Sequence, residues 1–206
     1  MTNIAYSIKN LGITDYQTTW QEMKSFTENR SHETRDEYWV LQHNPVFTLG
    51  VAGREEHILN KVHNIPIIRV DRGGQITYHG IGQIIIYALI DIKRLGLSIR
   101  ELVIRLEQGI VDYLASVGIN ANGDRCAPGV YVDGKKIASI GLKVRKNCTY
   151  HGISFNAAMD TTPFNYINVC GYSGLQVIQL KDLVVFENIN TESTKLTNCI
   201  IQSVYK

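Results

Sequence analysis

Apolar residues follow a helical period in three stretches of the chain, and these stretches predict three helices. The first covers roughly Asp15–Asn29, and the last covers roughly Glu192–Tyr205. The middle helix, Ser98–Val117, has the clearest boundary signal, because Ser98 and Glu101 have the spacing of a capping box. The stretches between and before these predicted helices do not follow a helical period.

Runs of β-branched and aromatic residues between these helices predict strands. Gln83–Asp91 is almost continuously apolar, which is typical of a strand covered on both faces. Asp133-Gly134 is a strong hairpin signal, followed by a long strand at Lys136–Arg145. Other predicted strands are Ile4–Ile8, Glu37–Gln42, Ile65–Val70, Val130–Val132 and Thr149–Asn156, with Pro45–Leu49 continuing the sheet. We expect an α+β fold, with mixed α/β sheets and packed helices, in a single domain over residues 1–206.

Composition and charge narrow the class of protein. Hydrophobic residues make up 44% of the 206 residues and charged residues 19%, which suits a packed core and argues against disorder. The formal net charge of +2 is too small to indicate nucleic-acid binding, although it is compatible with an acidic protein partner. The N-terminal residues lack a signal-peptide pattern, and no apolar run is long enough to span a membrane. We therefore predict a cytoplasmic protein without membrane or nucleic-acid partners.

The cysteines are the first candidates for chemistry. Their spacing fits neither a zinc site nor a disulfide framework, so each is expected to be a free thiol. Cys170 lies in a glycine-flanked loop, Ile167–Tyr172, which suits an exposed reactive thiol. A buried cysteine is usually a small hydrophobe, and we expect this of Cys148 and Cys199. Cys126, also in a loop, is the rival nucleophile.

Lys136 lies on the apolar face of its predicted strand. Because side chains alternate along a strand, Lys136 shares its face with Ala138 and Ile140. A partly buried ammonium has a lowered pKa and strongly favours a nearby anion. Lys136 is therefore a candidate cation for a Cys170 thiolate. The alternative is that its ammonium reaches solvent at the strand end.

A glycine-rich segment, Arg72–Gln83, follows a predicted strand. Four of its twelve residues are glycine, which lets a ligand approach the backbone and exposes amide donors. It matches neither the Walker nor the Rossmann pattern. His79 and His151 each precede a glycine and offer a Cys–His pairing as a competing interpretation. The remaining histidines are expected at the surface: His32, His43, His57 and His63.

Together these segments resemble the lipoyl(octanoyl) transferases of the biotin/lipoyl protein ligase superfamily. The family motif RGGxxTxHGPGQ corresponds to Arg72–Gln83, and GxKIAxxG corresponds to Gly134–Gly141. The motif INPCGY corresponds to Ile167–Tyr172, and the His-Gly after the strand corresponds to His151-Gly152. The resemblance implies a fold like the catalytic domain of biotin/lipoyl protein ligases.

The resemblance also implies a reaction without cofactor or metal. An octanoyl group passes from octanoyl-acyl carrier protein to the motif cysteine as a thioester. It then passes to a lysine of lipoyl domains in 2-oxoacid dehydrogenase E2 subunits or in the glycine cleavage H protein, as the first step of endogenous protein lipoylation. By motif position Cys170 is the nucleophile, and Lys136 is the residue that in the family lowers the pKa of that cysteine. The implied acyl-binding residues are Arg72, Gly73, Gly74, Gln75, Ile76, Thr77, Tyr78, His79, Ser139, Ile140, Gly141, Gly152, Ile153 and Ser154.

Two residues depart from the family pattern, and three other functions stay open. Ile81 and Val169 replace the prolines of HGPGQ and INPCG, which removes a fixed φ rather than a reactive group.

An ATP-dependent lipoate or biotin protein ligase would share the fold, although the biotin-ligase run GRGRxGR is absent. A non-catalytic acyl or carrier-protein binding module would tolerate Cys170→Ser. A Cys–His hydrolase would release free octanoate. We expect a monomer.

Overall fold

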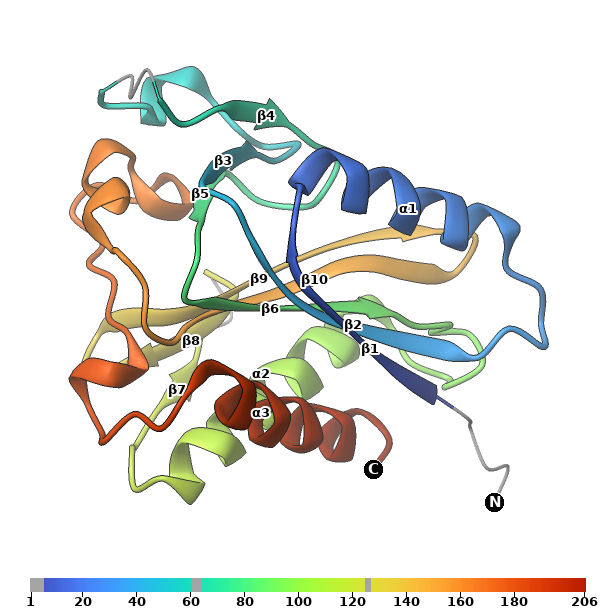
Figure 1. The fold of residues 1–206 in the computed structure, drawn as a ribbon. Helices are drawn as coiled ribbons and strands as arrows, with labels where there is room; N and C mark the ends of the chain where they lie inside the picture. Colours follow the sequence, from blue (N-terminus) through green and yellow to red (C-terminus); the bar gives the residue numbers. More distant parts are fainter. Residues whose placement is uncertain (1–5, 61–63, 125–126) are drawn as a thin grey trace.

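Two sheets and three α-helices make up the part of the chain that the computed structural model describes, residues 6–60, 64–124 and 127–206 (Figure 1). In chain order the elements are β1 (Tyr6–Thr14), α1 (Tyr16–Asn29), β2 (Asp36–His43), β3 (Val46–Leu49), η1 (Glu55–His57), β4 (Ile67–Arg69), β5 (Ile76–His79), β6 (Gln83–Leu89), α2 (Ile99–Ser116), β7 (Asn122–Gly123), β8 (Gly129–Val132), β9 (Lys135–Arg145), β10 (Cys148–Asn156), η2 (Thr162–Tyr166), η3 (Val169–Gly171), η4 (Leu180–Asp182) and α3 (Ile189–Val204), where η marks a short 3₁₀ helix. The predicted α+β class is confirmed.

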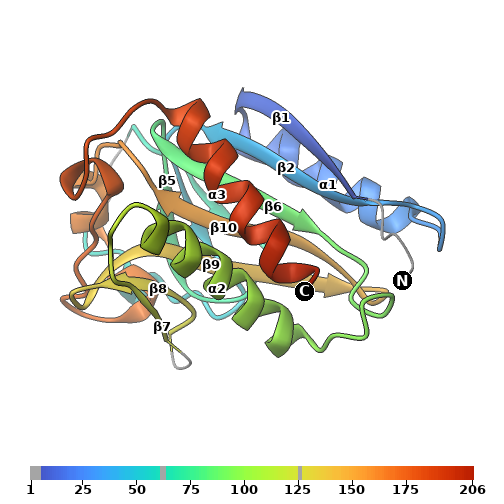
Figure 2. The same ribbon diagram turned by 90° about the horizontal axis from the view of Figure 1, so that it is seen from below.

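The larger sheet has seven strands in the order β1-β2-β6-β10-β9-β8-β7. Helices α2 and α3 cover one face, and α1 covers the other (Figures 1 and 2). Central strand β6 is buried along its whole length, as its continuous apolar run predicts. Ile84 and Ile86 pack in the core under α2 and α3, whereas Ile85 and Tyr87 pack with Met23 of α1. Helix α2 begins at the predicted capping box of Ser98 and Glu101.

The smaller sheet, in the order β4-β3-β5, corrects one sequence prediction and contains one strand that the sequence did not predict. Strand β3 does not continue the large sheet but pairs with β4 and β5. Strand β5 lies inside the glycine-rich segment, where four residues are too few for a visible alternation. The first strand is longer than predicted and runs to Thr14, while positions 4 and 5 lie outside the described residues.

Two contacts bring distant segments together beside β9. Helix η3, which contains Cys170, packs on β5. The pairing of β8 with β9 ends at Gly129 and Ser139, so the edge of β9 beyond this point has no strand beside it among the described residues. The amide of Gly73 donates to the carbonyl of Leu142 at this edge (3.0 Å). The glycine-rich segment, the edge of β9 and the cysteine loop therefore surround one space.

Across the described ranges, no helix is both long and apolar enough to cross a lipid bilayer.

Candidate active site

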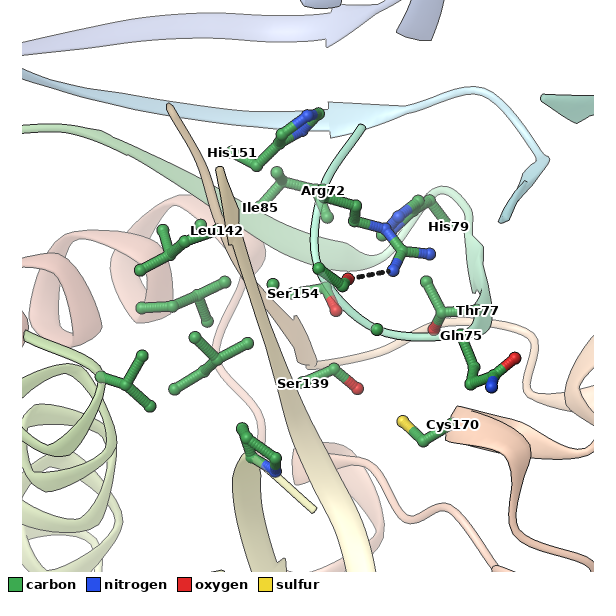
Figure 3. Close-up of a pocket in the computed structure, with 18 of the residues that line it drawn as sticks. Arg72, Gln75, Thr77, His79, Ile85, Ser139, Leu142, His151, Ser154 and Cys170 are labelled. Atoms are coloured by element: carbon green, nitrogen blue, oxygen red, sulfur yellow. Dashed lines mark hydrogen bonds between the residues drawn. The ribbon is translucent and has the colours of Figure 1, made fainter. Parts of the chain in front are cut away.

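A cavity of about 360 Å³ lies where these segments meet (Figure 3). Its walls come from the glycine-rich segment, β9, β10, the first turn of α2 and the cysteine loop. All the predicted site residues line it except Tyr78. The sequence motifs thus converge on one cavity, although they are separated by as many as about a hundred positions in the chain.

Tyr78 is the exception, and its place is a correction. Side chains of β5 alternate, so Thr77 and His79 face the cavity while Tyr78 faces the other way. Tyr78 packs in a separate core cluster, against Phe47 and Phe164. It supports β5 from behind instead of contacting an acyl group.

Cys170 lies half-buried in η3 with a left-handed backbone (φ 56°). A left-handed conformation costs a non-glycine residue free energy, and the adjacent Gly171 shares it (φ 82°). Val169, which replaces the family's proline, is buried in the cluster around Phe47 and Ile76. At this position side-chain packing of Val169 fixes the cysteine loop, in place of the fixed φ that the motif proline would supply.

Lys136 is buried, at 1% exposure, and its ammonium contacts Cys170. Its Nζ donates to Cys170 Sγ (3.2 Å), to the Pro128 carbonyl (3.0 Å) and to the Tyr131 hydroxyl (3.0 Å). A Cβ atom at Gly129 would lie 2.7 Å from Lys136 Cε, so only glycine leaves room for this side chain. The alternative that the ammonium reaches solvent is wrong.

The pKa of Lys136 corrects the expected direction. Burial by itself would lower it, but the charge of Cys170 and the hydrogen bond with Tyr131 act more strongly together, and the pKa lies above its ordinary value. An ammonium therefore faces the sulfur at neutral pH. Sequence analysis missed Tyr131 and Gly129, because their roles depend on a side chain reaching back across the hairpin.

Histidine does not pair with Cys170 among the described residues. His79 hydrogen-bonds with Gln83 Oε1 (2.8 Å) and Thr48 Oγ1 (3.2 Å). His151 Nε2 hydrogen-bonds with Asp71 Oδ1 (3.0 Å). The geometry thus favours a lysine partner for the thiol over the Cys–His interpretation.

The far wall of the cavity is polar. Arg72 is buried and donates to the carbonyl (2.6 Å) and hydroxyl (2.7 Å) of Thr48. Although burial would raise it, hydrogen bonds from His151, Tyr150 and Trp20 hold the pKa of Asp71 well below its usual range. Asp71 therefore fixes the His151 ring with Nε2–H directed at a carboxylate.

His43 is a further correction, because it was expected at the surface and is fully buried. Its Nε2 hydrogen-bonds with the hydroxyl of Tyr87 (2.6 Å). His57 is half-buried beside Gly171, its Nε2 lying 3.3 Å from where a Cβ of that glycine would stand. His32 is exposed as predicted, and His63 lies outside the described residues.

Buried histidines predict a loss of stability in weak acid. Burial lowers the pKa of His43 to about 4, and it also lowers the pKa values of His79 and His151. Unfolded histidines titrate near ~6.5. Between these pH values the unfolded chain binds more protons than the folded protein. The contribution of the neutral histidines to the free energy of unfolding is therefore fully present above pH ~6.5 and is lost as the pH falls toward 4.

Urea unfolding at a series of pH values measures this effect. Each proton contributes a slope of ~1.4 kcal/mol per pH unit, so three histidines give up to ~4 kcal/mol per unit. His43→Asn should reduce the slope of the unfolding free energy against pH by the contribution of about one proton. His32→Asn, at an exposed side chain, should leave this slope unchanged. An unchanged slope in His43→Asn would contradict the assignment.

Cys148 and Cys199 are poor nucleophiles. Burial raises the pKa values of Cys148 and Cys199 above that of an ordinary thiol. Neither lines the cavity. The rival candidate, Cys126, lies outside the described residues.

The lipoyl protein ligase A/B catalytic domain family matches residues 15–199 of this chain. The chain belongs to this family. The octanoyltransferase of Chromobacterium violaceum is 54% identical over 189 residues, which cover 92% of this chain and 91% of that protein. The octanoyltransferase of Nitrosomonas europaea is 53% identical over 198 residues, covering 96% and 97%. The predicted family and the predicted class of enzyme, an octanoyltransferase and hence an acyltransferase, are confirmed.

Solved structures confirm the predicted fold. A bipartite lipoate protein ligase from Thermoplasma acidophilum superposes with a TM-score of 0.77 at 14% identity, covering 98% of this chain and 84% of that one. The biotin protein ligase of Aquifex aeolicus gives a TM-score of 0.57 at 13% identity, covering 96% and 68%. Lipoate and biotin protein ligases therefore share this fold, whereas the relatives that are about half identical in sequence are octanoyltransferases.

Proposed function

We propose that this protein takes an octanoyl group from octanoyl-acyl carrier protein onto Cys170 and transfers it to a lysine of a lipoyl domain, as the first step of endogenous protein lipoylation. The observation that carries the proposal is the contact of Lys136 Nζ with Cys170 Sγ (3.2 Å) at a cavity with an apolar wall. The solved lipoate protein ligase of T. acidophilum is described together with its E2 lipoyl domain. An acceptor of that kind suits a member of the same family.

In the first half-reaction the Cys170 thiolate attacks the carbonyl carbon of the carrier thioester. A new sulfur–carbon bond forms, and the bond to the carrier sulfur breaks. The leaving thiolate needs a proton, and Lys136, whose Nζ hydrogen-bonds with Cys170 Sγ, is placed to donate it. The products are an acyl-Cys170 thioester, a carrier thiol and a neutral Lys136.

In the second half-reaction Lys136 is ready to act as a base. Burial lowers its pKa, and the charge of Cys170 is the main effect that offsets burial. Acylation removes this charge, which lowers the pKa of Lys136 below that in the free enzyme while the thioester exists. As the acceptor lysine attacks the thioester, Lys136 takes the proton that it loses, and Cys170 leaves as a thiolate beside a restored ammonium.

The acyl chain has an apolar wall on one side of the cavity. Ile140 and Leu142 of β9 face Ile99 and Val103 in the first turns of α2. Burial of each methylene against these side chains contributes ~0.8 kcal/mol, so the wall favours an apolar acyl chain over a short polar one. We further propose that residues 1–206 act as one catalytic domain, as a cytoplasmic monomer without a cofactor.

The proposal is tested by incubating the protein with octanoyl-acyl carrier protein and measuring its intact mass. We expect an octanoyl increment that peptide mapping places on Cys170 and that disappears when a lipoyl domain is added. Steady-state kinetics should be ping-pong. A requirement for ATP would favour a ligase, release of free octanoate would favour a hydrolase, and binding without turnover would favour a carrier-binding module.

A further inference from the structure

Two polar side chains of the glycine-rich segment, Gln75 and Thr77, flank Cys170 (Figure 3). Both line the cavity on the side of the thiol, and both come from β5 or the residue before it. Their positions follow from the packing of η3 on β5. Neither is a hydrogen-bond partner of Lys136, whose ammonium is held by the Pro128 carbonyl and the Tyr131 hydroxyl.

The Gln75 side chain packs directly on the cysteine loop. A Cβ atom at Gly171 would lie 3.0 Å from Gln75 Cγ and 3.4 Å from its Cδ. Its Oε1 accepts a hydrogen bond from the backbone amide of Arg54 (3.1 Å). This bond decides which end of the carboxamide is oxygen and leaves Nε2–H₂ as the free donor of a side chain that lies beside Cys170 (Figure 3). Nε2 donates no hydrogen bond to any of residues 6–60, 64–124 and 127–206.

The Thr77 hydroxyl is a second unused donor. The residue is 6% exposed, and its Oγ1 is buried without a hydrogen-bond partner among the described residues. Thr48, opposite Thr77 on β3, uses its own hydroxyl to bind Arg72, so it leaves the hydroxyl of Thr77 free. A buried hydroxyl without a partner costs free energy that a bound ligand can recover.

We propose that Gln75 Nε2 and Thr77 Oγ1 are side-chain donors to the oxyanion of both tetrahedral intermediates. The proposal rests on the proposed function, because it requires acyl transfer through Cys170. When the thiolate adds to the thioester, the carbonyl π pair moves onto oxygen, which becomes negative. When the intermediate collapses, the pair returns and expels the carrier thiolate. Both donors keep their protons throughout, so they act by charge stabilisation alone.

The site suits this role because its donors are fixed before the reaction. Gln75 is held by the Arg54 amide and by Gly171, and Thr77 is held in a paired strand. Donors that need no rearrangement, in a partly buried cavity, stabilise a developing charge more than water does. The same two donors serve the second half-reaction, because the carbonyl carbon is then bound to the same sulfur.

Thr77→Val and Gln75→Glu remove the donors with little change in shape. We expect each to lower the single-turnover rate of Cys170 acylation by octanoyl-acyl carrier protein on the order of 100-fold. Alkylation of Cys170 by iodoacetamide displaces iodide at a saturated carbon and forms no oxyanion. For Thr77→Val the alkylation rate should therefore stay within about twofold of the wild type. Thr77→Ser, which keeps the hydroxyl, should retain most of the acylation rate.

Thr27→Val is the matched control, because Thr27 has a buried, unpartnered hydroxyl in α1 away from the cavity. It should leave both rates unchanged. Full acylation rates in Thr77→Val and Gln75→Glu would overturn the proposal, and so would equal losses of acylation and alkylation in Thr77→Val. A wild type that alkylates at Cys170 but forms no acyl adduct would instead remove the proposed function itself.

Discussion

Cys170→Ser is expected to lower kcat/KM for octanoyl transfer by at least ~10³-fold and to abolish the acyl adduct. A serine hydroxyl beside Lys136 is a much weaker nucleophile than a cysteine thiol in the same contact. Intact mass after incubation with octanoyl-acyl carrier protein measures the adduct, and modification of a lipoyl domain measures transfer.

Cys199→Ser is the matched control for this variant. Cys199 is a half-buried thiol in α3 and does not line the cavity, so its replacement should leave the adduct and the rate unchanged. Retention of transfer by Cys170→Ser would sink the thioester mechanism. An adduct that persists and maps to Cys126 would make that residue the nucleophile.

Lys136→Met is expected to have the second-largest effect. Loss of the ammonium removes the cation that contacts the Cys170 sulfur, so alkylation of Cys170 by iodoacetamide should slow at neutral pH. Acyl transfer at neutral pH should fall by ~10²–10⁴-fold, because the proton donor and acceptor of both half-reactions is lost. Iodoacetamide kinetics between pH 5 and 10 measure the first effect.

The stability of Lys136→Met is expected to fall together with its activity. The variant removes one partner of a buried contact and leaves the Pro128 carbonyl and the Tyr131 hydroxyl without this donor. We therefore expect a lower melting temperature, and the kinetics are measured at a temperature at which the variant is folded. Lys135→Met, at the exposed neighbouring lysine, should change neither the pH–rate profile nor the transfer rate. A wild-type pH–rate profile in Lys136→Met would remove the proposed role.

Local signals in the sequence were sufficient for most of the secondary structure. The capping box at Ser98 and Glu101, the continuous apolar run of β6 and the Asp133-Gly134 turn each depend on neighbouring residues only. The errors fall where a strand is short or has a neighbour on one side only, as in β1 and β5. There the burial pattern depends on which segments pack nearby, and no local period records it.

The sequence motifs named residues that the structure brings to one cavity, but they did not indicate how those residues are arranged. Motif resemblance and strand alternation identified Cys170 and Lys136, and alternation also placed Lys136 on a buried face. It did not indicate Gly129 or Tyr131, because their contacts with Lys136 cross the hairpin. The prediction for Tyr78 was wrong, because a motif covers consecutive residues whereas a strand presents only every second side chain to the cavity.

By itself the sequence determined the fold class, the family and the identity of the candidate nucleophile, because these depend on composition, periodicity and motif. Only the tertiary structure decided the direction of the Lys136 pKa, since burial and the charge of Cys170 oppose each other and their balance depends on a distance of 3.2 Å. It also decided which donors face the thiol. Gln75 and Thr77 belong to a motif about ninety residues before Cys170, and only the packing of η3 on β5 brings them to the sulfur.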